Sequence, residues 1–380
     1  MTTHMAQKQL TAERARREII RLSQAGLDFR ALQSETLKQL RKVIPIEASF
    51  FATVDPATLL FTSAMSDDIL QKATPQFIEN EFLQDDVNKF AALVHSGQPI
   101  GGLVQMTNQQ LEQSQRYREI LAPLGLGDEL RAALITRDVC WGVLCLHRER
   151  SSPPFDASEA AFLRRVIPSL AEGLRSSLLL GAATAEETAD APGLLLLGED
   201  HSIAAITPVA ERLLADVAEE DRCPVYGLPY AIHAVVARLR AAERHSEEPS
   251  ELAPRARLRT ASGRWLVLHA SRMTGAQADG QIAVIVEVAR PVEIAQLIVQ
   301  AYALSRRESE IVRLVAQGKS TAQMAEAFHI TANTVQDHLK AVFEKVGVRS
   351  RRELVSQLFA QQYQPRMAAG REPGADGWFA

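Results

Sequence analysis

The chain has 380 residues, of which 46% are hydrophobic and 23% charged, and its formal net charge is −4. This composition is typical of globular proteins and excludes an intrinsically disordered chain, while the length suggests two to three domains of roughly 150 residues each. Three cysteines are too few for a disulfide scaffold, and no run approaches the roughly 18 apolar residues of a membrane helix. The first residues lack the apolar core of a secretory signal, so we expect a cytoplasmic protein without membrane contact.

Residues 1–45 form an N-terminal helical segment, predicted as one helix over 6–43, because leucine and isoleucine recur near the 3.6-residue helical period. An α+β domain is expected over residues 46–180. Its strands are predicted in two hairpins, 49–54 with 59–62 and 131–136 with 139–146. Asp156, followed by Glu159, predicts the start of a long closing helix. This order indicates an antiparallel sheet with helices on one face.

A small, acidic stretch at residues 181–192 predicts a linker. A second α+β domain follows over residues 193–290. Its strands are predicted at 194–197, 203–206, 255–260, 264–271 and 281–288, and its helices at 208–214 and 231–244. Residues 291–303 predict a connecting helix, and the Pro- and Gly-rich residues 364–380 a flexible tail.

Residues 304–363 predict an all-α domain of four short helices. The helices are expected at about 305–317, 321–328, 332–346 and 350–360, and three capping boxes mark starts at Ser305 with Glu308, Ser320 with Gln323 and Ser350 with Glu353. Thr331 is a further N-cap candidate. Three residues separate the second and third helices, which is typical of a helix-turn-helix whose second helix enters the DNA major groove. Residues 301–363 contain nine basic and six acidic residues, a local charge that suits a polyanion.

This block closely resembles the LuxR-type helix-turn-helix domain of bacterial transcription regulators. The resemblance is ungapped over about 50 residues, and its matched positions are Leu304 to Glu308, Glu310, Gly318, Ala325, Thr334, Val335, His338, Leu339, Lys345, Gly347, Val348, Ser350 and Arg351. It implies that the third helix reads double-stranded DNA. The candidate DNA-binding residues are then Thr331, Asn333, Thr334, Gln336, Asp337, His338, Lys340 and Lys345.

The resemblance implies different roles along the third helix. Gln336, Asp337 and Lys340 match the positions that face the groove, and Lys345 matches a lysine that contacts the DNA backbone. Two departures stand out. His329 replaces the usual glycine of the turn, which is tolerable because histidine is among the residues that accept positive φ. Asp337 cannot approach phosphates favourably, so it either accepts from a cytosine amino group or disfavours wrong sites.

In this family the fourth helix commonly supplies the dimer contact, which Leu354 and Leu358 would form here; packing inside the same bundle is the alternative. Residues 1–180 resemble a GAF-type sensory domain in the order of their elements. Residues 193–290 are similar in strand and helix order to a PAS-like sensor, with a second GAF domain or an unclassified α+β domain as alternatives. Either fold can enclose an unidentified small molecule or serve only in dimerisation.

Signals for catalysis, metals and cofactors are weak. The GKS tripeptide at residues 318–320 is no P-loop, because Arg313 stands where glycine is needed. Cys140 and Cys145 are expected to be buried small side chains, and no cofactor or metal site is evident. We therefore expect a non-enzymatic, DNA-binding transcription regulator that acts as a homodimer, with RNA polymerase as a further partner. The alternative is a sensor or scaffold protein whose C-terminal bundle binds a protein partner.

Overall fold

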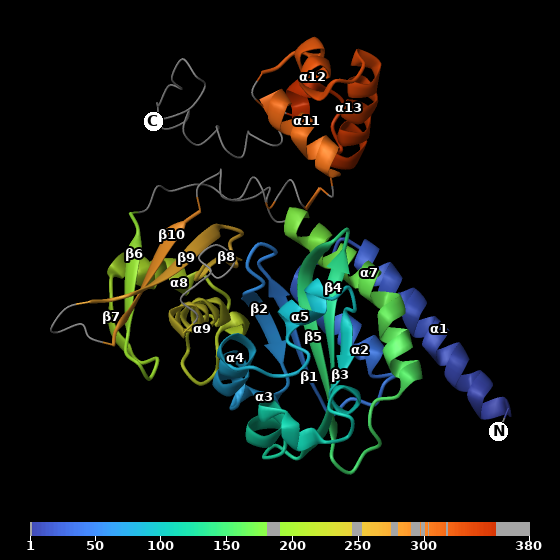
Figure 1. Ribbon diagram of the computed structural model, residues 1–380, viewed down its shortest axis with the longest axis vertical. Coiled ribbons are helices and arrows are strands. Elements are labelled where there is room, and N and C mark those ends of the chain that lie inside the picture. Colours follow the sequence, from blue (N-terminus) through green and yellow to red (C-terminus); the bar gives the residue numbers. More distant parts are fainter. Residues whose placement is uncertain are drawn as a thin grey trace. The chain divides into compact units, whose positions relative to one another are not determined.

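The computed structural model describes residues 2–180, 191–244, 253–274, 280–289, 297, 301–302, 304–316 and 318–354 (Figure 1). The chain divides into two compact units. The first holds residues 1–181 and 189–288, and the second holds residues 182–188 and 289–380. Among the described residues, no helix combines the length and apolar character needed to cross a bilayer.

The first unit begins with a five-stranded antiparallel sheet in the order β2-β1-β5-β4-β3. Its strands are β1 (Ala48–Val54), β2 (Phe61–Ser66), β3 (Ile100–Gly102), β4 (Leu126–Thr136) and β5 (Val139–Glu149). Both predicted hairpins are present. Arg137 and Asp138 turn between β4 and β5 with φ of 52° and 62°, the backbone sign that two-residue hairpin turns prefer.

Helices surround this sheet on both faces. They are α1 (Thr2–Gln24), α2 (Phe29–Leu40), α3 (Asp68–Gln71), α4 (Thr74–Leu83), α5 (Phe90–His95), α6 (Leu103–Met106), η1 (Leu111–Gln113), η2 (Tyr117–Leu121) and α7 (Ala157–Leu180). The expectation of helices on one face only is wrong. Strand β5 is buried along nearly its whole length, because α7 packs on β4 and β5 while α3, α5 and α6 contact β1 and β4.

The single helix expected over residues 6–43 is also wrong, since α1 and α2 are separate. Gly26 adopts a left-handed backbone with φ of 66°, and the Asp28 carboxylate then caps α2 by accepting from the amides of Arg30 and Ala31. The closing helix α7 starts as predicted. Asp156 and Glu159 form a reciprocal capping box at its N-terminus.

The middle domain repeats the same sheet plan with the order β7-β6-β10-β9-β8. Its elements are β6 (Gly193–Leu197), β7 (Ile203–Ile206), α8 (Pro208–Ala215), η3 (Glu219–Asp221), α9 (Tyr230–Arg244), β8 (Arg255–Arg259), β9 (Trp265–Arg272) and β10 (Ile282–Val288). Helix α8 packs on β6 and β10, and α9 packs on β8 and β9. The predicted strands and helices of this domain are thus confirmed to within one or two residues.

The middle domain docks onto the first sheet domain inside the same compact unit. Helix α9 packs against α4 and β2, and one hydrophobic core runs from Phe61 and Ile78 to Ala231 and Leu266. The carboxylate of Asp55, after β1, accepts three hydrogen bonds from Arg257 of β8 at 2.6–3.0 Å. The sequence patterns had predicted two domains joined by a linker and had not predicted this docking. Of that linker, residues 181–190 lie outside the described residues.

The second unit contains α11 (Arg306–Ala316), α12 (Thr321–Phe328) and α13 (Ala332–Val346), followed by a helical turn at 351–354 (Figure 1). Among its described residues 304–354, the buried apolar ones are Ile311, Val312, Val315, Met324, Val335, Leu339, Val342, Val346, Val348 and Leu354. The first three predicted helices are confirmed. The fourth, expected over 350–360, is described only to residue 354. Most of the connecting helix expected at 291–303 and all of the 364–380 tail lie outside the described residues.

Candidate nucleic-acid interface

Helices α12 and α13 are fixed by hydrogen bonds at each end of the turn between them. Ser320 and Gln323 form a complete capping box at the start of α12. His329 ends α12 in the left-handed region with φ of 54°, and the Ile330 amide donates to the Ala325 carbonyl at 3.0 Å. Thr331 then caps α13 by accepting from the Thr334 amide at 3.2 Å. The turn therefore tolerates histidine in place of glycine, as the sequence indicated.

One face of α13 is buried and the other presents polar side chains to solvent. Val335, Leu339 and Val342 point into the core. Six of the candidate DNA-binding residues are exposed: Thr331 at the cap, Lys345 near the end of the helix, and four on its polar face, Asn333, Gln336, Asp337 and Lys340. Amide, carboxylate and ammonium groups are the side-chain types that recognise base edges and phosphates.

The threonines and His338 are less free than those four. The Thr331 hydroxyl serves as the N-cap and lies 2.9 Å from the Thr334 hydroxyl, so both are partly committed to holding the helix start. Thr334 and His338 are half-buried. Their position suits docking of the helix end more than reading of bases.

Lys345 lies in an ion pair inside the domain. Its Nζ is 2.8 and 2.5 Å from the two carboxylate oxygens of Glu308. Glu308 also forms the predicted capping box with Ser305, and its side chain is only 7% exposed. Burial raises the pKa of Glu308, but Lys345 and the Ser305 amide outweigh it and lower the pKa below its usual value. Lys345 therefore joins α13 to α11, a role that the resemblance to DNA-backbone lysines did not suggest.

The remaining basic residues of this segment divide between solvent and the fold. Arg351 donates to the Lys319 carbonyl, whereas Arg349 and Arg352 are exposed. Ser350 caps the last helical turn through the Glu353 amide, but the Glu353 carboxylate accepts from the amide of Arg349 rather than from Ser350. The third predicted capping box is thus only half formed.

Leu354, one of the two leucines expected at a dimer contact, is fully buried within the chain. This burial favours the alternative of packing inside the bundle. The other, Leu358, lies outside the described residues.

The cysteines and histidines do not form a metal or nucleophile site in the described part of the chain, where no cluster of three or more metal-ligating side chains occurs. Cys140 and Cys145 are buried as expected. Burial raises the pKa of each thiol to about 12, so both remain protonated at neutral pH.

Two families match separate parts of the sequence. The family described as bacterial regulatory proteins, luxR family, matches residues 302–358, and the GAF domain family matches residues 28–173. The GAF match begins just before α2, whereas the sequence pattern placed the start of this domain at residue 46. The PAS-like character of the middle domain stays a prediction.

Two relatives match a short part of the sequence. The chain is 35% identical over 57 residues to the transcriptional regulatory protein DesR of Bacillus subtilis, which is 15% of this chain and 29% of DesR. It is 39% identical over 56 residues to the response regulator protein VraR of Staphylococcus aureus, which is 15% of this chain and 27% of VraR. The chain therefore spans less than a third of the length of these relatives.

Two solved structures show a weaker likeness. SdiA of Escherichia coli has a TM-score of 0.29 at 13% identity, covering 92% of this chain and 97% of SdiA. The VqmA dimer of Vibrio cholerae, described as a LuxR-type receptor, has a TM-score of 0.20 at 14% identity, covering 45% of this chain and 83% of VqmA. These scores are too low to support any inference about the arrangement of the chain. The family matches and the geometry of α12 and α13 are sufficient by themselves: the chain carries a C-terminal helix-turn-helix domain of the luxR family and an N-terminal GAF domain.

Proposed function

We propose that the protein is a sequence-specific, DNA-binding transcription regulator in which α13 enters the major groove. The observation that carries this proposal is the exposed polar face of α13, held by the capped turn of a luxR-family helix-turn-helix. A helix presented in this way can place three or four side chains against base edges while neighbouring groups contact phosphates.

The side chains of that face have distinct chemical capacities. The Gln336 amide can pair with adenine through two hydrogen bonds, and the Asp337 carboxylate can accept from the cytosine amino group. Lys340 can donate to guanine or to a phosphate. Asn333 and Thr334 lie nearer the helix start and suit docking, as does the half-buried His338, and Thr331 supports the helix start as the cap. Lys345 can reach a phosphate only by loosening its ion pair with Glu308.

The finer parts of the proposal concern assembly and signal. Two copies would read half-sites about one helical turn apart, as dimeric helix-turn-helix proteins do, and RNA polymerase would be a further contact in the cytoplasm. The GAF and middle domains would sense a signal or hold the dimer together. The identical strand order of the two sheets supports a sensor-type assignment for the middle domain, either PAS-like or a second GAF domain.

The experiment that tests this proposal is selection of bound DNA from a random pool by the full-length chain at two salt concentrations. We expect an enriched, roughly palindromic motif whose binding weakens steeply with salt. Gln336→Ala should change the preferred base at one position of each half-site, at a cost of about 1–3 kcal/mol for the original base. Glu326→Gln, an exposed change on α12, is the matched control and should leave the preference unaltered.

Two outcomes would contradict parts of the proposal. Unchanged base preference in Gln336→Ala would show that this residue does not read DNA. Absence of any enrichment at either salt, with the domain folded, would favour a bundle that binds a protein partner.

A further inference from the structure

Each of the two sheets ends in two edge strands, and β7 is the edge that the described elements leave open. Strands β2 and β8 contact each other where the GAF and middle domains meet, and the Arg257 amide of β8 donates to Asp55. Strand β3 has only 3 residues. Strand β7 pairs with β6 on one side and lies at the outer end of its sheet (Figure 1). An open edge presents backbone amides and carbonyls that a further strand can pair with.

The composition of β7 is unusual for an open edge. Natural edge strands commonly carry charged side chains or proline, which prevent pairing with other chains. Strand β8, at the other end of the same sheet, carries Arg255, Arg257 and Arg259. Strand β7 is Ile-Ala-Ala-Ile, its first three residues are exposed, and Ile203 is 48% exposed. The strand therefore offers an apolar edge without a protecting charge.

A β-bulge places both isoleucines of β7 on one face of the sheet. Ile206 lies opposite Leu195 and Ile203 lies opposite Leu197, with Ala204 as the extra residue. Leu195 and Leu197 are fully buried on the face that α8 covers. Because residues directly opposite each other share a face, both isoleucines lie on that face, although a spacing of three would separate them in a regular strand. Ile206 packs against the core there, whereas Ile203 is left largely in solvent.

We propose that β7 is an interface between two copies of this chain, in which the two β7 strands pair antiparallel about a two-fold axis. An interface of this symmetry must be complementary to itself. The sequence Ile-Ala-Ala-Ile reads the same in both directions. An axis between Ala204 and Ala205 therefore places Ile203 of one copy opposite Ile206 of the other, and Ala204 opposite Ala205. The sheet of each middle domain then continues into that of the second copy.

Pairing in this register covers the groups that β7 leaves exposed. The four isoleucines of two copies gather on the α8 side of the joined sheet, so that Ile203 of each copy packs against Ile206 of the other. The Thr207 amide donates to the Leu194 carbonyl of β6, so the amide and carbonyl of Ile206, the next residue along, point to the open side. These backbone groups gain partners from the second copy. The small alanines at the centre allow the two strands to approach closely.

This inference deepens the assembly part of the proposed function and rests on the two-copy arrangement given there. A strand of 4 residues buries less than the roughly 1,200 Å² at which stable interfaces begin, so we expect a weak, reversible dimer in solution. Binding of both copies to adjacent half-sites on one DNA would reinforce such a contact, because the second association becomes intramolecular.

Sedimentation of the full chain without DNA, over a range of concentrations, tests the interface. We expect a reversible monomer–dimer equilibrium. Ile203→Lys places a charge on the open edge and should raise the dimer Kd at least about tenfold. Ile285→Lys is the matched control, since Ile285 is 36% exposed and lies on the opposite face of the same sheet, and its Kd should stay within about twofold of the natural value. A chain that stays monomeric, or a dimer that Ile203→Lys leaves intact, overturns the proposal.

Cysteine cross-linking tests the register with substitutions that leave the fold intact. The natural cysteines, Cys140, Cys145 and Cys223, are buried and do not interfere. Ala204→Cys in one copy lies directly opposite Ala205→Cys in the other, at a Cα separation of about 5 Å that suits a disulfide. Mild oxidation of an equal mixture should give linked dimers at least about five times faster than either variant alone, because a residue and its own symmetry mate lie on opposite faces. Equal rates in all three samples would overturn the register.

Neither measurement uses DNA, so the two proposals fail separately. If Ile203→Lys leaves the dimer intact while the natural chain still selects a DNA motif, α13 reads DNA and the dimer contact lies elsewhere. If β7 pairs as described and no DNA is selected at either salt concentration, only the DNA-binding proposal is contradicted.

Discussion

The GAF domain and the helix-turn-helix domain place the same kinds of side chain in opposite environments. On α13, Gln336, Asp337 and Lys340 are exposed and available to a ligand. In the GAF domain, Arg116 and Glu129 are essentially inaccessible to solvent. An exposed charge costs little folding free energy and stays accessible to a ligand. A buried charge must be paired with an opposite charge for the folded state to be stable. Polar residues are thus left accessible to a ligand in one domain and are committed to internal structure in the other.

The largest expected effect comes from breaking the buried ion pair of Arg116 and Glu129. Glu129→Gln keeps the shape of the side chain but removes the carboxylate that lies 2.8 Å from the buried guanidinium of Arg116, so we expect the GAF domain to lose about 3–5 kcal/mol of stability. Chemical denaturation followed by the fluorescence of buried Trp141 measures this loss. Glu149→Gln, an exposed change on the same hairpin, should cost less than about 0.5 kcal/mol. Equal losses in the free energy of unfolding for the two variants would contradict the stabilising role of the buried Glu129.

Between the GAF and middle domains, Asp55 and Arg257 form an ion pair that is intermediate between the exposed and the fully buried charges. Asp55→Asn removes the charge that Arg257 faces, and we expect a loss of roughly 2–5 kcal/mol from the docked arrangement. The middle domain should then unfold at lower denaturant than the GAF domain, as reported separately by Trp265 and Trp141 in single-tryptophan variants. Asp138→Asn, in an exposed hairpin turn that tolerates asparagine, is the control. Coincident transitions in Asp55→Asn would show that this pair does not hold the domains together.

A histidine pair in the middle domain predicts a dependence on pH. The Nδ1 atoms of His201 and His233 lie 3.4 Å apart, while Arg240 lies 3.0 Å from His201 Nε2. Burial and the neighbouring His201 lower the pKa of His233 to about 3, and burial and Arg240 lower that of His201 to about 4. The unfolded chain binds these protons first, so stability is complete above about pH 6.5 and falls as the pH drops toward 4.

The expected loss from His233 between about pH 6.5 and pH 5 is about 2 kcal/mol. Denaturation of the natural protein at several pH values should show this slope. His233→Gln should flatten it, whereas His95→Gln, at an exposed site, should not. A slope that survives in His233→Gln would place the responsible proton elsewhere.

Local patterns in the sequence were sufficient for most individual elements. Alternating apolar residues located the strands of both sheets. Capping boxes, Ser305 with Glu308 and Ser320 with Gln323, located the starts of α11 and α12. The break between α1 and α2 was equally local, and Gly26 and Asp28 carried a signal that the overall periodicity obscured. The positive φ of His329 agrees with the sequence argument, because His329 stands where the family usually has glycine and histidine tolerates this backbone conformation.

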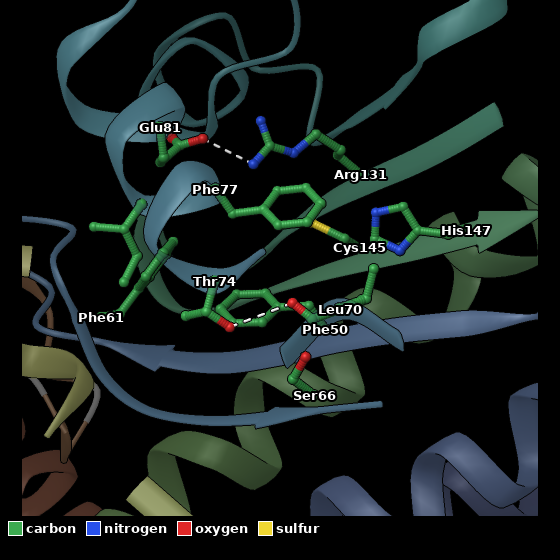
Figure 2. Close-up of a pocket in the computed structure, with 11 residues that line it drawn as sticks. Phe50, Phe61, Ser66, Leu70, Thr74, Phe77, Glu81, Arg131, Cys145 and His147 are labelled. Carbon is green, nitrogen blue, oxygen red and sulfur yellow. Dashed lines mark hydrogen bonds and ion pairs between the residues drawn. The ribbon is translucent and has the colours of Figure 1, made fainter. Parts of the chain in front are cut away.

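Contacts between distant residues could not be read in this way. Asp55 and Arg257 are 202 positions apart, and nothing in either neighbourhood specifies the other. Glu129 sits in a strand like many other charged residues, and only the fold shows that it is buried. The candidate DNA-binding residues could be predicted because they lie close together in the sequence on one surface helix. The pocket lined by Phe50, Phe77 and His147 (Figure 2), in contrast, is built from residues far apart in the sequence.

Two lysines of α13 allow a direct comparison of an exposed charge with an ion-paired one, with the smallest expected effects. Lys340 is exposed, whereas Lys345 pairs with buried Glu308. Lys345→Ala should destabilise the helix-turn-helix by about 1 kcal/mol, because Glu308 loses its counter-charge at a partly solvated site. Faster hydrogen exchange of the α13 amides in the full chain measures this loss. Lys340→Ala should leave exchange unchanged and reduce the salt dependence of DNA binding by about one phosphate contact.

The opposite pattern would reverse the roles of the two lysines. A reduced salt slope in Lys345→Ala, with unchanged exchange, would mean that Lys345 leaves Glu308 when DNA is present and acts as the backbone contact that the family resemblance implies. Glu308→Gln separates the cases further. If the ion pair stabilises the free domain, Glu308→Gln accelerates hydrogen exchange as Lys345→Ala does. If Lys345 moves to a DNA phosphate, Glu308→Gln strengthens DNA binding, because the lysine no longer has to break an ion pair to reach the duplex.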